Sequence, residues 1–289
     1  MHVNPNELIK DQLVSRAAEL ERVNDADVLT FIGAMIFGVD DAIRDAVEEL
    51  STKRNKVLMV LETPGGYMEI AHRIADTLRH HYGQVEFLVP SHAMSAGTIL
   101  VMSGDAIWMN YYSILGPIDP QIEVDGKLVP ALGYLEKYNE LVEKANTPEG
   151  LNDAELAYLL RRFDPAALYQ YEHEKLLSVA LLKDWLVKYK FKDWVVTNGR
   201  QLSVTPEMKE ERAREIAEEL NNTERWHSHG RGISMAVAIN DLNLMIDDFD
   251  ANQELKVAVR HYYKLLKNFM DVLDVKNIVH TREKFSSLS

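Results

Sequence analysis

The sequence of 289 residues contains no cysteine, so disulfide bonds, thiolate metal sites and cysteine nucleophiles are all excluded. It also lacks a long apolar run, because the longest near-apolar stretch, residues 31–39, has about half of the length that a membrane-spanning helix needs. The first residues carry charges of both signs and no apolar core of a secretion signal. We therefore expect a cytoplasmic protein with no membrane span.

Positive charge is scarce, with 32 Lys and Arg against 45 Asp and Glu and a formal net charge of −13. Nucleic acids and anionic membranes are bound through clustered positive charge, so we expect neither as a partner. No G-x-x-x-x-G-K-[ST] phosphate-binding loop is present either, and any ATP-driven unfolding would need a separate ATPase partner. Hydrophobic residues make up 46% of the chain, which is enough to bury a sizeable core.

Buried strands and amphipathic helices alternate along the first half of the chain. Continuous apolar runs predict strands within residues 28–38, 57–62, 85–90 and 106–110. Because strands that alternate with helices pair in parallel, this part predicts an α/β core up to about residue 125.

The second half is predicted to be mostly helical. Asp164-Pro165 and Thr205-Pro206 each place a capping side chain before a proline, which is typical of a helix start. The last helix, about 254–273, has a heptad-like seam of apolar residues. We interpret this seam either as packing on its own subunit or as a contact between subunits.

Two turns between a strand and a helix carry residues suited to chemistry. In Glu62-Thr-Pro-Gly-Gly-Tyr67, two adjacent glycines let backbone N–H groups approach a ligand, as an oxyanion hole requires, although short glycine turns are common. In Pro90-Ser-His-Ala-Met-Ser-Ala-Gly-Thr98, Ser95 stands at the start of a helix, either as an exposed nucleophile or only as a helix cap.

Together these two segments, in which Ser95 lies 29 positions after Gly66, resemble the Clp-protease and crotonase superfamily. The run AMSAGT, followed by a strand and SILGPIDPQI, is most similar to the serine dehydrogenase proteinase group, relatives of signal peptide peptidases. The resemblance implies a Clp-protease/crotonase-like α/β fold of repeated ββα units. It also implies a serine peptidase without cofactor, with Ser95 as the nucleophile and an oxyanion hole at Gly65, Gly66 and Ala96.

The general base stays open. Clp proteases have a histidine where this sequence has the segment LGPIDP, residues 115–120. A Ser-Lys dyad, as in signal peptide peptidases, would use Lys137 or Lys144, and burial would have to lower the lysine pKa by roughly 3 units. His229 falls near the place of the Clp triad acid and needs no such shift. It would act as the base, orient the base, or be an ordinary surface histidine.

The sequence contains two other histidine arrangements that could take part in a site. His227 and His229 have no evident third ligand, so we expect no metal site. His92 could reach the site from its turn, but a local hydrogen bond is the simpler expectation.

We expect three parts in the chain: an N-terminal helical extension (1–27), a catalytic domain (28–249) with a helical insertion at about 142–200, and a C-terminal helix and tail (250–289). The resemblance also implies that the substrates are peptides or unfolded polypeptides. It further implies a homo-oligomer, which is expected to be a ring or a dimer of rings. The alternatives are a crotonase-like acyl-CoA enzyme and a catalytically silent ring scaffold.

Overall fold

The computed structural model describes residues 4–124, 127–197, 199 and 201–288. Its main sheet has seven strands in the order β10-β5-β3-β2-β1-β11-β12. In chain order these are β1 Asp27–Ile32, β2 Lys56–Glu62, β3 Gln84–Leu88, β5 Ala106–Met109, β10 Asp247–Asp248, β11 Asn277–His280 and β12 Phe285–Leu288. The strands from β10 to β1 run parallel, whereas β11 and β12 are antiparallel to their neighbours. The predicted α/β core with a parallel sheet is confirmed.

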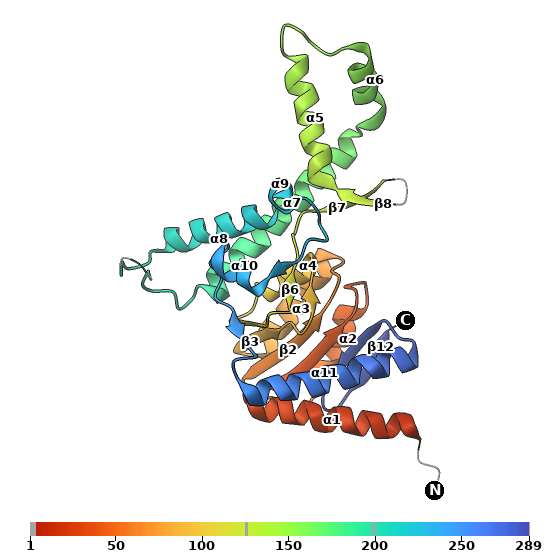
Figure 1. The fold of residues 1–289 in the computed structure, drawn as a ribbon, viewed down its shortest axis with the longest axis vertical. Helices are drawn as coiled ribbons and strands as arrows, with labels where there is room; N and C mark the ends of the chain where they lie inside the picture. The colour runs from red at the N-terminus through yellow and green to blue at the C-terminus, as the bar shows by residue number, and fades with distance from the viewer. Residues whose placement is uncertain (1–3, 125–126, 198, 200, 289) are drawn as a thin grey trace.

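Helices cover both faces of this sheet. Three helices connect the parallel strands: α2 Val39–Glu48, α3 Met68–His81 and α4 Ala96–Val101. They pack with Leu29 and Phe31 on one face of β1, while Val28 and Ile32 point to the other face, as the two-residue period of a strand requires. That second face is covered by α1 Pro5–Asn24 and α11 Gln253–Leu273, which lie side by side (Figure 1).

The heptad-like seam of α11 packs inside the chain. Its residues are buried against α1 and the sheet: Leu255, Val259, Tyr262, Leu266 and Phe269. The own-subunit interpretation of the seam is confirmed, and its interpretation as a subunit contact is wrong, because the chain itself already covers this face. The residues after α11, expected as a tail, form β11 and β12 and extend the main sheet beyond β1.

A second, three-stranded sheet lies at the carboxyl end of the main one. It consists of β4 His92–Ala93, β6 Ile114–Leu115 and β9 Ile233–Ser234 in the order β4-β6-β9. β4 and β6 are parallel, and β9 is antiparallel to β6. An isolated bridge between Thr63 and Ala93 joins the end of β2 to this small sheet.

The remaining elements lie between β6 and β10. They are the hairpin β7 Gln121–Val124 and β8 Lys127–Pro130, and the helices α5 Ala131–Ala145, α6 Asp153–Arg162, α7 Pro165–Trp185, η1 Leu186–Lys190, α8 Pro206–Leu220, α9 Thr223–Trp226 and α10 Met235–Asn240. The side chains of Asp164 and Thr205 cap α7 and α8, as predicted. Figure 1 shows α5 and α6 projecting away from the sheet, while α7 and α8 lie closer to it.

Candidate active site

The glycine turn, residues 63–67, leaves the carboxyl end of β2 and leads into α3. Gly65 and Gly66 have φ angles of +101° and +144°, which side-chain-bearing residues rarely adopt. A Cβ atom on Gly66 would lie 2.3 Å from the backbone oxygen of Met35. That oxygen accepts a hydrogen bond of 2.9 Å from the Tyr67 N–H. Only glycine fits at position 66, because the turn is pressed against the loop that follows β1.

The serine turn, residues 91–95, leads through β4 into α4. Ser95 has φ +52° and ψ −119°, a strained conformation for a residue with a side chain. Its side chain makes no capping hydrogen bond to α4, and the residue is partly exposed. No capping hydrogen bond therefore supports the interpretation of Ser95 as only a helix cap. Strain of this kind at an exposed hydroxyl is typical of functional sites.

The glycine turn and the serine turn are in direct contact. A Cβ atom on Gly65 would lie 2.8 Å from the Cβ atom of Ser95. Two backbone hydrogen bonds of 3.0 Å join the turns, from Thr63 N–H to the oxygen of His92 and from Met94 N–H to the oxygen of Thr63. The side-chain and backbone positions of these residues are thus fixed relative to each other.

Two N–H groups beside Ser95 carry no backbone hydrogen bond. Within the part of the chain that the structure describes, Gly66 and Ala96 donate to no backbone acceptor. Each belongs to one of the two joined turns. An N–H pair left uncommitted next to a hydroxyl is an arrangement that can stabilise a developing negative charge.

The small sheet places two more polar residues on segments at the same end of its strands. β4 and β6 are parallel and β9 is antiparallel, so the segments after β4, after β6 and before β9 all lie at one end of the sheet. Ser95, Asp119 and His229 occupy these three places. The Thr98 hydroxyl binds the backbone of Gly116 at 2.9 Å, which holds the segment after β6 against α4.

His229 and Asp119 form a hydrogen-bonded pair. The Nδ1 atom of His229 lies 2.9 Å from Oδ1 of Asp119, whose side chain is only 3% exposed. The other carboxylate oxygen accepts a hydrogen bond of 2.7 Å from the Gln121 amide. With Nδ1 engaged, Nε2 is the nitrogen of His229 that remains for another proton partner, as in serine hydrolases that use a His-Asp pair.

His229 was predicted from the sequence as a site residue, whereas Asp119 was not. The signal was present, because Asp119 lies in the LGPIDP segment that replaces the Clp histidine. Clp proteases have the histidine in this segment and the acid at the later position. Here Asp119 lies in the segment and His229 near the later position, so the two residue types are exchanged.

Comparison with known families connects this geometry to a class of protein. Residues 19–158 match the family model described as ClpP-like SDH-type serine proteinase. This segment is therefore similar to that of ClpP-like serine proteinases. It contains the glycine turn, Ser95 and Asp119, whereas His229 lies beyond it.

Relatives of part of this chain are found in Methanocaldococcus jannaschii. The uncharacterized protein MJ1495 is 30% identical over 129 residues, which cover 43% of this chain and 42% of the relative. The uncharacterized protein MJ0137 is 32% identical over 117 residues, which cover 36% of this chain and 41% of the relative. The chain thus matches about two fifths of the length of each of these relatives.

A solved structure is also similar to part of this chain. It is that of a mutant of the 1510-N membrane-bound stomatin-specific protease, with 16% sequence identity and a TM-score of 0.31. The match covers 50% of this chain and 73% of that one. In the described part of this chain, no helix has both the length and the apolar character to span a membrane.

The lysines considered as bases lie on α5, in the projecting helices (Figure 1). Lys137 is 54% exposed and forms an ion pair of 2.7 Å with Glu140, and this hydrogen bond raises the pKa of the lysine. Lys144 pairs with Glu155 at 2.6 Å. A lysine that acts as a base needs a lowered pKa. The surroundings of Lys137 raise its pKa instead.

His92 has a local partner. Nδ1 of His92 lies 3.1 Å from the Ser91 hydroxyl, which is the local hydrogen bond expected for it. Among the residues with described positions, no group of three or more His, Asp or Glu side chains could hold a metal ion.

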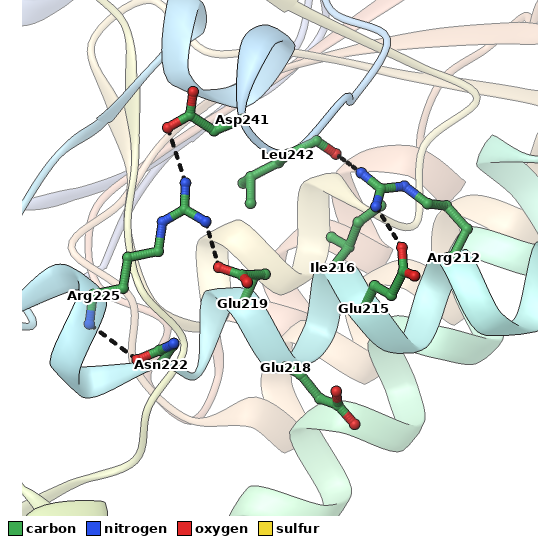
Figure 2. Close-up of a pocket in the computed structure, with 9 residues that line it drawn as sticks. All are labelled: Arg212, Glu215, Ile216, Glu218, Glu219, Asn222, Arg225, Asp241 and Leu242. Atoms are coloured by element: carbon green, nitrogen blue, oxygen red, sulfur yellow. Dashed lines mark hydrogen bonds and ion pairs between the residues drawn. The ribbon is translucent and has the colours of Figure 1, made fainter. Parts of the chain in front are cut away.

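A polar pocket of about 470 Å³ lies between α8 and α10, and Figure 2 shows its lining. Arg225 crosses it to Glu219 and Asp241, and Arg212 binds Glu215 and the backbone oxygen of Leu242. Both arginines form ion pairs or hydrogen bonds with other residues that line the pocket, and these contacts join its walls. It contains neither Ser95 nor His229.

Proposed function

We propose that the protein is a serine peptidase that forms an acyl-enzyme on Ser95. The observation that carries this proposal is the direct contact of the glycine turn with Ser95 inside the segment that matches the serine proteinase family. A family match gives the class of chemistry, and the contact gives a nucleophile beside two uncommitted N–H groups. The expected substrates are peptides or unfolded polypeptides.

In the proposed reaction, Oγ of Ser95 attacks the carbonyl carbon of the scissile peptide bond. The N–H groups of Gly66 and Ala96 stabilise the negative oxygen of the tetrahedral intermediate. The base takes the serine proton and passes it to the leaving amine, and water then hydrolyses the acyl-enzyme with the same base.

We propose His229 as this base, with Asp119 as the group that orients it. The hydrogen bond to Nδ1 leaves Nε2 for the serine proton, and histidine is the side chain that most often serves as a general base. The Ser-Lys alternative through Lys137 has less support, because that lysine is exposed and its pKa is raised. The distance between Ser95 and His229 need only reach hydrogen-bonding range when substrate is bound.

Labelling with a fluorophosphonate probe tests the nucleophile. We expect the purified full chain to be modified at Ser95, as mapped by mass spectrometry, and Ser95→Ala to abolish the modification. Ser228→Ala, a substitution of an exposed serine, is the matched control and should label like the unmodified protein. A folded protein that is not labelled, or is labelled elsewhere, would contradict the proposal.

The rate of the same labelling reaction tests the base. His229→Ala should slow it by about 10²- to 10⁴-fold, the usual contribution of a general base. His227→Ala removes an exposed histidine of the same loop and should leave the rate unchanged. A comparable loss in Lys137→Ala, with His229→Ala unaffected, would support the Ser-Lys alternative instead.

We also propose that the peptidase is a homo-oligomer. Apolar side chains on α6 and α7 support this, because Leu160, Tyr169 and Leu176 are 75%, 64% and 62% exposed. Labelling should therefore be measured on each species that size-exclusion chromatography separates. Any requirement for an ATPase would appear as cleavage of peptides but not of folded proteins.

A further inference from the structure

A buried carboxylate lies directly before the glycine turn. Glu62 is the last residue of β2 and is 6% exposed. Its side chain accepts a hydrogen bond from the Tyr263 hydroxyl and forms an ion pair of 3.0 Å with Nζ of Lys267. Burying a carboxylate is costly unless it is paired and hydrogen-bonded, and α11 supplies both partners.

Tyr263 and Lys267 act together because of their spacing on α11. They are four residues apart, so their side chains lie on the same face of the helix. Burial and the hydrogen bond to Glu62 raise the pKa of the Tyr263 hydroxyl, which therefore stays a donor at neutral pH.

The backbone of Glu62 is tied to both sides of the candidate site. Its carbonyl oxygen accepts a hydrogen bond of 3.0 Å from the N–H of Gly33, in the loop against which Gly66 is pressed. The next residue, Thr63, makes the two backbone hydrogen bonds to the serine turn. A shift of Glu62 would therefore move the glycine turn relative to Ser95.

The Tyr263 hydroxyl also lies near the start of the serine turn, since the Ser91 hydroxyl acts to lower the pKa of Tyr263, against the larger effects of burial and Glu62. The Ser91 hydroxyl in turn lies 3.1 Å from Nδ1 of His92, three residues before Ser95. The tyrosine that binds Glu62 is therefore close to both turns.

We propose that Glu62, held by Tyr263 and Lys267, is a positioning residue that fixes the distance between the Gly66 N–H group and Ser95. The inference rests on the proposed function of these two turns. Displacements of about 1 Å in a reacting constellation cost on the order of 100-fold in rate, so a residue that never touches substrate can control the chemical step.

The test compares two neighbouring tyrosines of α11. Tyr263→Phe removes the hydroxyl that contacts Glu62, and Tyr262→Phe removes an equally hydrogen-bonded hydroxyl that contacts Thr30 and His280 instead. At a temperature where both variants are folded, Tyr263→Phe should lower kcat for a peptide or ester substrate, and the rate of fluorophosphonate labelling, by about 10- to 100-fold. KM should change little. Tyr262→Phe should lower the thermal midpoint but leave kcat unchanged.

Lys267→Gln gives a second, milder variant, since Lys267 is 35% exposed. It should lower kcat in the same direction, whereas Lys264→Gln, an exposed neighbour on α11, should not. Rescue provides a further readout: Glu62→Gln, which can still accept a hydrogen bond from Tyr263, should retain more kcat than Glu62→Ala.

The outcomes separate the inference from the function on which it rests. Normal kcat in Tyr263→Phe, or equal losses in Tyr263→Phe and Tyr262→Phe that follow their thermal midpoints, would overturn the positioning role and leave the peptidase proposal intact. Failure of the unmodified protein to label at Ser95 would overturn both.

Discussion

In the proposed mechanism, Asp119 determines which nitrogen of His229 is available to Ser95. The carboxylate is buried and bound to Nδ1, so the imidazole is held in one orientation and one tautomer. An amide at position 119 can keep the shape of the pair but can donate a proton to Nδ1 and reverse the tautomer.

We therefore expect Asp119→Asn to slow fluorophosphonate labelling of Ser95 by about 10³- to 10⁴-fold, the size of effect seen when a triad carboxylate becomes an amide. The measurement is the second-order rate constant of labelling at pH 7 to 8. Glu123→Gln, a carboxylate-to-amide change four residues later, is the control. Labelling of Asp119→Asn at an unchanged rate would show that His229 does not act as the base.

Single residues also show what the sequence could predict of the site. Gly65, Gly66 and Ser95 could be predicted because the two turns together carry the family resemblance, although a glycine turn or a serine cap alone is common. The pairing of Asp119 with His229 was not, because 110 residues separate them and only the two-residue strands β6 and β9 bring them together. Strands of that length have no periodicity that a sequence pattern could reveal.

At the scale of elements, the turn between β11 and β12 fastens the C-terminal hairpin to the start of the chain. Nη1 of Arg282 lies 2.7 Å from Glu21 on α1 and 2.9 Å from Asp27 on β1, and both carboxylates are buried. Its other terminal nitrogen binds the backbone oxygen of Thr52. One guanidinium therefore binds two buried carboxylates and a backbone oxygen at once, using several of the donors that arginine provides.

Arg282→Met should destabilise the fold by about 3 to 5 kcal/mol, because it removes the cation that two buried carboxylates share. The measurement is the free energy of unfolding in urea at pH 7. Arg22→Met is the control, since the ion pair of Arg22 with Glu254 lies at the surface and its loss should have little effect. Equal stability of Arg282→Met and the unmodified protein would show that this cluster does not hold the hairpin.

The same element shows why part of the fold was missed. The runs at 57–62 and 85–90 were predicted as strands because both faces of a central parallel strand are apolar. The strands β11 and β12 have only four residues each and include polar residues such as Asn277 and Ser286, so they resembled a tail. Their place in the sheet depends on pairing with β1, which is more than 240 residues away in sequence.

At the scale of the whole molecule, the two ends of the chain form one layer behind the site. Helices α1 and α11 pack on each other and on the same face of the sheet (Figure 1). Between that layer and the sheet lies a buried polar chain. The Tyr262 hydroxyl is 2.7 Å from both the Thr30 hydroxyl and Nδ1 of His280, and all three residues are at most 1% exposed.

The hydrogen-bonded residues Thr30, Tyr262 and His280 make the free energy of unfolding depend on pH. Burial lowers the pKa of His280 from 6.5 to about 4, so the folded protein keeps the ring neutral, whereas the unfolded chain takes up a proton below pH 6.5. The stabilisation is therefore complete above pH 6.5 and is lost as the pH falls from 6.5 to about 4. By linkage the loss is roughly 3 kcal/mol.

Urea unfolding between pH 8 and 4.5 measures this loss, and His280→Asn isolates it, because an amide does not titrate. The variant should be less stable at pH 8, since it leaves part of a buried site unfilled. Its free energy of unfolding should nevertheless fall less steeply with decreasing pH than that of the unmodified protein. His261→Asn, at an exposed position of α11, should keep the original slope. Equal slopes for all three proteins would mean that His280 is protonated in the folded state as readily as in the unfolded chain, and that the Tyr262 hydroxyl accommodates its charge.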